Sequence, residues 1–246
     1  MSIIKENNKF IYTKSDYTDI LANKDFHMPG WIWAHSTIFR AFELIENKLN
    51  SWNPKSVGEI STVVKAIRNV FEFLHQHHHH EDELVFPILK DQSEDIKNLL
   101  VKLDEQHVEW DRLQGEVNDI INSLLSIKSV QDQIEDVDRI IRELCLKFSE
   151  TRHCVVSHFL DEEQTLLPIV VTIPKNKQND IANHIQTQSR KDRLFKFSVC
   201  LINDAAQHDK AVENSFNSEV PWLIRKLVVG LWKKSEYNWF LKALEV

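Results

Sequence analysis

The sequence predicts an all-α protein, an antiparallel four-helix bundle with additional C-terminal helices. Apolar residues recur at the three- and four-residue spacing of a helix through four long stretches, which short polar connections join. The 246 residues include only 4 Gly and 6 Pro, where average usage would give roughly 17 and 12. This composition disfavours glycine-rich phosphate loops and turn-dense β sandwiches.

Prolines mark the bounds of the four predicted bundle helices. Pro29 precedes the first helix, Pro54 separates the first from the second, and Pro87 and Pro168 mark the ends of the second and the fourth. The predicted helices span about residues 31–50, 60–86, 96–124 and 134–167.

A polar, turn-rich stretch after the fourth helix opens a second helical segment. We expect helices there at about 179–189 and 193–211 and a last helix that starts at Pro221. The predicted parts are an N-terminal segment (1–28), the bundle (29–172) and a C-terminal extension packed on it (173–246). The tryptophans of the last helix could form a partner-binding or membrane-facing stripe, but we favour packing against the bundle for this set, Trp222, Trp232 and Trp239.

Charge and cysteine content narrow the class of protein. The net charge of −7 leaves no basic excess for nucleic acid, and it disfavours acidic lipid surfaces for the same reason. No apolar run approaches the roughly 18 residues of a membrane span, and the N-terminus lacks the apolar core of a secretory signal. The three cysteines form no disulfide pattern, so we expect a cytoplasmic protein, with the nucleus also open.

An internal repeat carries the functional signal. Residues 77–87 and 158–168 both contain His-x-x-x-Glu, with the histidine ten residues before a proline. Four-residue spacing places the imidazole and the carboxylate on one helix face, about 40° apart around the axis. In both repeats this face also carries the apolar residues, so His77, Glu81, His158 and Glu162 should point into the bundle.

Histidines from the other two helices complete a candidate metal site. His35 and His107 each lie on an apolar stripe, so four histidines and two carboxylates converge from four helices. Nitrogen and oxygen ligands without thiolate suit iron, manganese or zinc, and open positions in such sets are typical of non-haem iron that meets oxygen. The residues by their type therefore indicate a site for two metal ions, with iron, manganese and zinc all open at this point.

These segments resemble the hemerythrin-like, His-His-Glu cation-binding domain. The resemblance covers about residues 28–170 and rests on the order His, His-x3-Glu, His, His-x3-Glu. It implies a four-helix bundle that holds an oxo- or hydroxo-bridged di-iron centre. In this resemblance Glu81 and Glu162 are bridging carboxylates, and the terminal ligands are His35, His77, His107 and His158.

One position departs from the oxygen-carrying members of that family, which have a second histidine one turn after the one that matches His107. Here the residue is Asp111. Either Asp111 is a ligand, or one iron has an open or water-filled position, or His78 compensates from the second helix.

Three functions stay open at this point. The resemblance implies binding of dioxygen or a related diatomic molecule, or sensing of oxygen or iron, with the C-terminal helices able to dock a protein partner. A di-iron oxidase or oxygenase that acts on a small organic substrate is the alternative, since an incompletely filled coordination sphere admits other ligands. Iron storage or iron-centre repair is the third.

Overall fold

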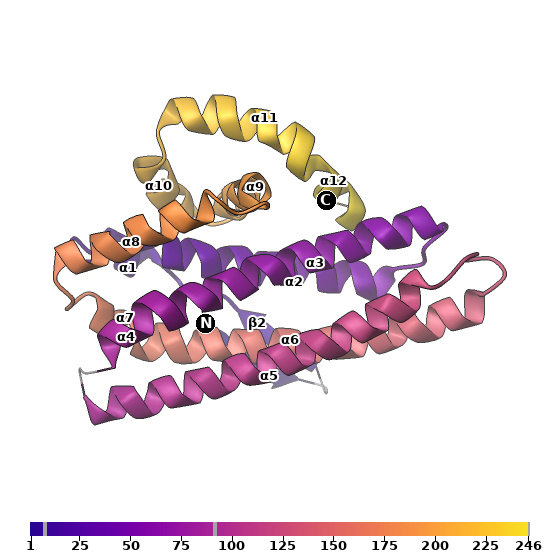
Figure 1. Cartoon of the computed structure of the whole chain (residues 1–246), viewed down its shortest axis with the longest axis horizontal. Coiled ribbons are helices and arrows are strands. Elements are labelled where there is room, and N and C mark those ends of the chain that lie inside the picture. The colour runs from indigo at the N-terminus through magenta and orange to yellow at the C-terminus, as the bar shows by residue number, and fades with distance from the viewer. Residues whose placement is uncertain (7–8, 91–92, 246) are drawn as a thin grey trace.

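Four long helices form an antiparallel bundle in the computed structural model, which describes residues 1–6, 9–90 and 93–245 (Figure 1). α5 and α6 lie side by side along their length, and α2 packs on both α3 and α6. The predicted fold class is thereby confirmed. The bundle helices are α2 (Pro29–Ser51), α3 (Val57–His80), α5 (Glu94–Leu125) and α6 (Ile134–Thr165).

Local signals start these helices. Pro29 occupies the first turn of α2, where a backbone N–H has no helical partner. The hydroxyl of Ser56 accepts from the Glu59 amide, and that of Ser93 accepts from the Ile96 amide, each at 3.2 Å. These N-caps satisfy amides that the first turns of α3 and α5 would otherwise leave unpaired.

The sequence predicted that the second helix would end near Phe86 and Pro87, but the helical path continues to Leu89. The chain continues from α3 into a wide π-type turn, η1 (Glu81–Val85), and then into α4 (Phe86–Leu89). Pro87 is tolerated because it lies in the first turn of α4, where its missing N–H costs no hydrogen bond. The other repeat ends similarly, with Pro168 in the first turn of α7 (Leu167–Val170).

The described part of the C-terminal extension consists of helices joined by short turns, but one expected helix is divided. The stretch predicted at 193–211 forms α9 (Phe195–Ala206) and ends there, and Asp209 then caps α10 (Lys210–Glu219) by accepting from two backbone amides. The first helix of the extension is α8 (Lys175–Ser189). The long last stretch comprises η2 (Ile224–Val229), α11 (Gly230–Trp232), η3 (Lys233–Tyr237) and α12 (Asn238–Leu244).

The extension shares the hydrophobic core of the bundle. α9 packs on α2 and α12 packs on α3, while the yellow segment around α11 arches over them (Figure 1). Phe197, Tyr237 and Phe240 are buried in the same apolar cluster as the bundle residues. Trp232 and Trp239 are half-buried against this cluster, but Trp222 is exposed. The division at residues 28 and 172 stays a prediction.

The first residues form a β-hairpin that the sequence analysis did not predict. β1 (Ser2–Glu6) pairs antiparallel with β2 (Lys9–Thr13), and the short helix α1 (Thr18–Ala22) follows. The guanidinium of Arg152 lies 4.6 Å from the ring centroid of Tyr12, which places the hairpin against α6. Among the described helices, none combines the length and the apolar character needed to cross a bilayer.

Candidate metal centre

All six residues that the sequence singled out as ligands are buried, and they come from the four bundle helices and the turn after α3. They meet inside the bundle, together with His78, which the sequence left as an open alternative. The set is His35 on α2, His77 and His78 at the end of α3, Glu81 in η1, His107 on α5, and His158 and Glu162 on α6.

The donor atoms fall into two groups that share Glu81. One group is His35, His77, Glu81 and Glu162, and the other is His78, Glu81, His107 and His158. In each group the possible ligand atoms lie within 4.8 Å of one another. Each group is therefore small enough for one ion, and the shared carboxylate places the two positions next to each other.

The two glutamates lie between the groups. Oε1 of Glu81 is 3.1 Å from Nε2 of His77, whereas its Oε2 is 3.9 Å from Nε2 of His107. Oε2 of Glu162 is 3.2 Å from Nε2 of His35 and 3.6 Å from Nε2 of His158. Both carboxylates thus face a histidine of each group, which is the geometry of a bridging ligand.

Most of these polar atoms have no hydrogen-bond partner. The described residues give no hydrogen bond to these buried atoms, although some lie 3.1–3.2 Å from one another: both carboxylate oxygens of Glu81 and of Glu162, Nε2 of His35 and of His77, and both ring nitrogens of His78. Unpaired buried polar atoms cost free energy, and buried carboxylates cost most. A cation between them would satisfy the whole set, so these residues fit a metal centre.

His77 and His78, which are adjacent at the end of α3, both face inward, one toward each group. Neighbouring positions of an α-helix differ by about 100°, and the centre lies at the end of α3, where His77 and His78 each reach one group. The π-type turn begins at Glu81, whose side chain lies inside the bundle, while the side chain of the following residue, Asp82, is 40% exposed. Such turns interrupt α-helices most often at functional sites.

Asp111, the other ligand that the sequence left open, is exposed and belongs to neither group. It follows His107 by one turn of α5, on the part of that helix that faces solvent. The donor that completes the second group in the structure is His78 from α3 instead. Its ring stacks on that of His107, with the ring centroids 4.1 Å apart.

Three residues that the sequence analysis missed hold the imidazole rings from outside. Nδ1 of His35 lies 2.9 Å from Glu163, Nδ1 of His107 lies 3.0 Å from Asp82, and Nδ1 of His158 lies 3.0 Å from Gln106. A proton on Nδ1 that is donated to these oxygens leaves Nε2 free as the ligand atom. Each of these three partners is next in the sequence to a predicted ligand, as Glu163 is to Glu162, but it contacts the ring of a different ligand. This adjacency is the signal that the sequence offers for them.

Glu163 is the most strongly bound of these outer residues. Its carboxylate accepts hydrogen bonds from the hydroxyls of Tyr17, at 2.7 Å, and Ser15, both in the N-terminal segment. Burial opposes its ionisation, but the hydrogen bonds from His35, Ser15 and Tyr17 outweigh burial and lower the pKa of Glu163 to about 2. The N-terminal segment therefore reaches the centre through a carboxylate that is ionised at neutral pH.

Burial sets the protonation states inside the centre. It holds the pKa of His77, His78 and His158 well below the usual value, so these rings are neutral, which is the form that binds metal. Burial and the neighbouring Glu162 raise the pKa of Glu81 to about 8. For His35, burial is outweighed by the surrounding carboxylates, chiefly Glu162 and Glu163, and its pKa is raised.

Aromatic rings enclose the centre. Phe159 stacks on His35 with ring centroids 4.0 Å apart, and Trp31 meets the same ring edge-on. On the other side Trp110 contacts His78 edge-on, and Phe86 lies parallel to His107. These apolar contacts exclude water and strengthen the electrostatic interactions inside.

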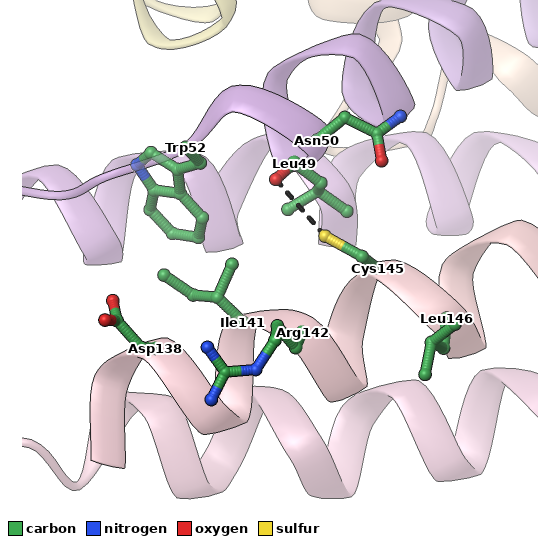
Figure 2. A pocket seen from close by; sticks show the side chains of 8 residues that line it. All are labelled: Leu49, Asn50, Trp52, Asp138, Ile141, Arg142, Cys145 and Leu146. Carbon is green, nitrogen blue, oxygen red and sulfur yellow. Dashed lines mark hydrogen bonds between the residues drawn. The ribbon is translucent and has the colours of Figure 1, made fainter. Parts of the chain in front are cut away.

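A separate surface hollow, of about 550 Å³, lies away from the centre between the end of α2 and the first half of α6 (Figure 2). Leu49, which lines it, is 14 residues after His35 on α2, or about 21 Å along the helix axis. Figure 2 shows the thiol of Cys145 donating to the carbonyl of Leu49, at 3.2 Å. Burial raises the pKa of this thiol, so it is not an activated nucleophile.

Comparison with known proteins agrees with this geometry. The family described as "Hemerythrin HHE cation binding domain" matches residues 32–170, which include both repeats. A curated protein of Dictyostelium discoideum, named as uncharacterized, is 30% identical over 248 residues, which cover 98% of this chain and 92% of the relative. No solved structure matches the chain. The chain belongs to the hemerythrin HHE cation-binding domain family, and residues 32–170 form its metal-cation-binding domain.

Proposed function

We propose that this domain is a non-haem di-iron centre that binds dioxygen or a related diatomic molecule. The observation that carries the proposal is the pair of adjacent donor groups that share Glu81. One ion would be held by His35 and His77, the other by His78, His107 and His158, with Glu81 and Glu162 between them. Iron is favoured over manganese and zinc because mixed imidazole and carboxylate sets with an open position are typical of non-haem iron that meets oxygen.

The unequal supply of histidines supports binding of a small ligand. One group contains two imidazoles and the other contains three. The ion in the first group would keep a position free for an external molecule, as open positions do in other non-haem iron sites. The iron pair would supply the redox chemistry, while Phe159 and Trp31 exclude water from that side.

A second function, oxidation or oxygenation of a small organic substrate, has its own supporting observation. A surface hollow of about 360 Å³ is lined by Tyr17, Glu163 and Leu167, among others. This volume is within the range of small-molecule sites. Glu163 also contacts His35, so a molecule in the hollow would be one side chain away from the centre.

The visible absorption spectrum during oxygen exposure tests the proposal. The anaerobic protein is loaded with ferrous iron, its iron content per chain is measured, and oxygen is admitted and then removed. A band that forms with oxygen and disappears on deoxygenation, at about two irons per chain, is the expected result. A band that decays to a ferric product would instead favour the oxidase, and the absence of any band would contradict both functions.

Adjacent histidines of α3 provide a matched pair of variants for the two-ion assignment. His78→Ala removes one of three imidazoles from the second group, so iron content should fall from about two to about one per chain. His79→Ala changes an exposed ring on the same helix and should leave iron content unchanged. Equal iron content in both variants would show that His78 is no ligand.

A further inference from the structure

An exposed apolar surface lies on the last long helical stretch. This stretch arches over the bundle as the yellow segment around α11 (Figure 1). The side chain of Trp222 is 63% exposed and that of Leu231 is 71% exposed. The outer apolar surface comprises Trp222, Leu223, Ile224, Leu227 and Leu231.

The opposite side of the same stretch already fixes it to the protein. Val229 and Tyr237 are buried in the apolar cluster that the bundle and α9 share. The guanidinium of Arg225 donates to the side chain of Asn217 in α10. The fold thus uses one side of the stretch and leaves the outer apolar surface in water, where large apolar side chains gathered together mark an interaction site.

The charge of this stretch differs from that of the whole chain. Arg225, Lys226, Lys233 and Lys234 lie between Glu219 and Glu236, with no acidic residue between those two glutamates. Lys226 and Lys234 are exposed beside the apolar surface. The net charge of −7, which argued against acidic lipids, is a sum over the whole chain. Electrostatic attraction to a membrane surface acts only within a Debye length of about 10 Å. The local charge is therefore the one that such a surface meets.

We propose that residues 222–234 dock the protein on the surface of a membrane that contains anionic phospholipids. A Trp- and Leu-rich face flanked by Lys and Arg is the pattern of a helix that lies in the lipid interface. The apolar side chains would enter the boundary between headgroups and acyl chains, and the basic side chains would contact the phosphates. The mode is peripheral and independent of the metal centre.

Vesicle flotation of the full-length, iron-loaded protein tests the proposal. The protein should bind vesicles of phosphatidylcholine mixed with phosphatidylserine and remain free of vesicles of phosphatidylcholine alone. High salt should weaken binding because it screens the basic side chains. Lys226→Glu should lower the partition coefficient about fivefold or more, since each basic residue near such a surface contributes about 1 kcal/mol. Lys128→Glu is the control, at an exposed lysine outside the stretch.

Two leucines of equal exposure give a matched pair for the apolar contribution. Leu231 and Leu146 are each 71% exposed, and Leu146 lies on α6 far along the chain from the docking stretch. Leu231→Glu should lower the partition coefficient about tenfold or more, and Leu146→Glu should not change it. Unchanged iron content in both variants shows that each has folded.

Three results would overturn the proposal. The first is binding to neutral vesicles as strong as to anionic ones, and the second is no binding to either. The third is a dimer, measured by light scattering, that Leu231→Glu converts to a monomer, because the apolar surface would then be a contact between two copies of the chain. Each result leaves the iron content, and therefore the proposed metal centre, untouched.

Discussion

Three of the buried histidines at the centre have their ring orientation set by a hydrogen bond on the side away from the carboxylates. Glu163, Asp82 and Gln106 accept or share these bonds at Nδ1, which turns Nε2 inward. Glu163 differs from the other two because it is a buried carboxylate that the N-terminal segment also binds. A charged partner also raises the basicity of the ring it holds, and so strengthens metal binding.

The variant Glu163→Gln should therefore weaken iron binding. The amide retains an acceptor for His35 but loses the negative charge, and loss of an outer partner of this kind costs about 10-fold in metal affinity. Competition with a chelator of known affinity measures the change. Glu83→Gln, at an exposed position near the same centre, should leave the affinity as it was. Equal affinities in the two variants would contradict a role for Glu163 in orienting His35.

The sequence predicted the bounds of a helix best where the helix packs through a single apolar face. The apolar period of α2, α5 and α6 located these helices to within a few residues. The sequence was least informative where the backbone departs from α geometry, as in η1 and η2, because the apolar period is interpreted as a regular α-helix and gives no sign of a wider turn. The break between α9 and α10 was also missed, since Asp209 signals it only as a cap.

Packing of α12 on the bundle should contribute strongly to stability. Phe240 is fully buried and touches the rings of Phe197 and Tyr237. Phe240→Ala should lower the free energy of unfolding by about 3–5 kcal/mol, through lost transfer energy and the cavity left behind. Urea denaturation measures this loss. Trp222→Ala removes a large but exposed ring and should change stability by less than about 0.5 kcal/mol. Similar values for the two variants would show that α12 is not part of the bundle's cooperative unit.

For the molecule as a whole, the metal centre is a structural element as well as a functional one. Glu81 and Glu162 are both buried inside the bundle near the end of α3, and their carboxylate oxygens form no hydrogen bond among the described residues. Without cations these groups oppose folding, and with cations they join four helices at one point. Metal binding should therefore be coupled to the stability of the entire bundle.

Removal of iron should lower the melting temperature of the protein. Iron at a thousandfold excess over its dissociation constant contributes about 4 kcal/mol, which corresponds to about 10 °C for a chain of this size. Calorimetry of iron-loaded and chelator-treated protein measures the difference. The melting temperature should rise again when iron is restored. A chain that melts at the same temperature in both states would contradict coupling between the centre and the fold.

The bundle and the residues that converge inside it follow from the amino-acid sequence, because helical period places His35, His107 and the two His-x3-Glu pairs on apolar faces. Their assignment as ligands stays a prediction that the iron measurements test. The contacts between distant segments show the rest: His78 and not Asp111 lies beside the centre, Glu163 contacts His35, and the surface around Leu231 is exposed. Each of these depends on which segments, distant along the chain, come into contact, and period within a single helix carries no information about that contact.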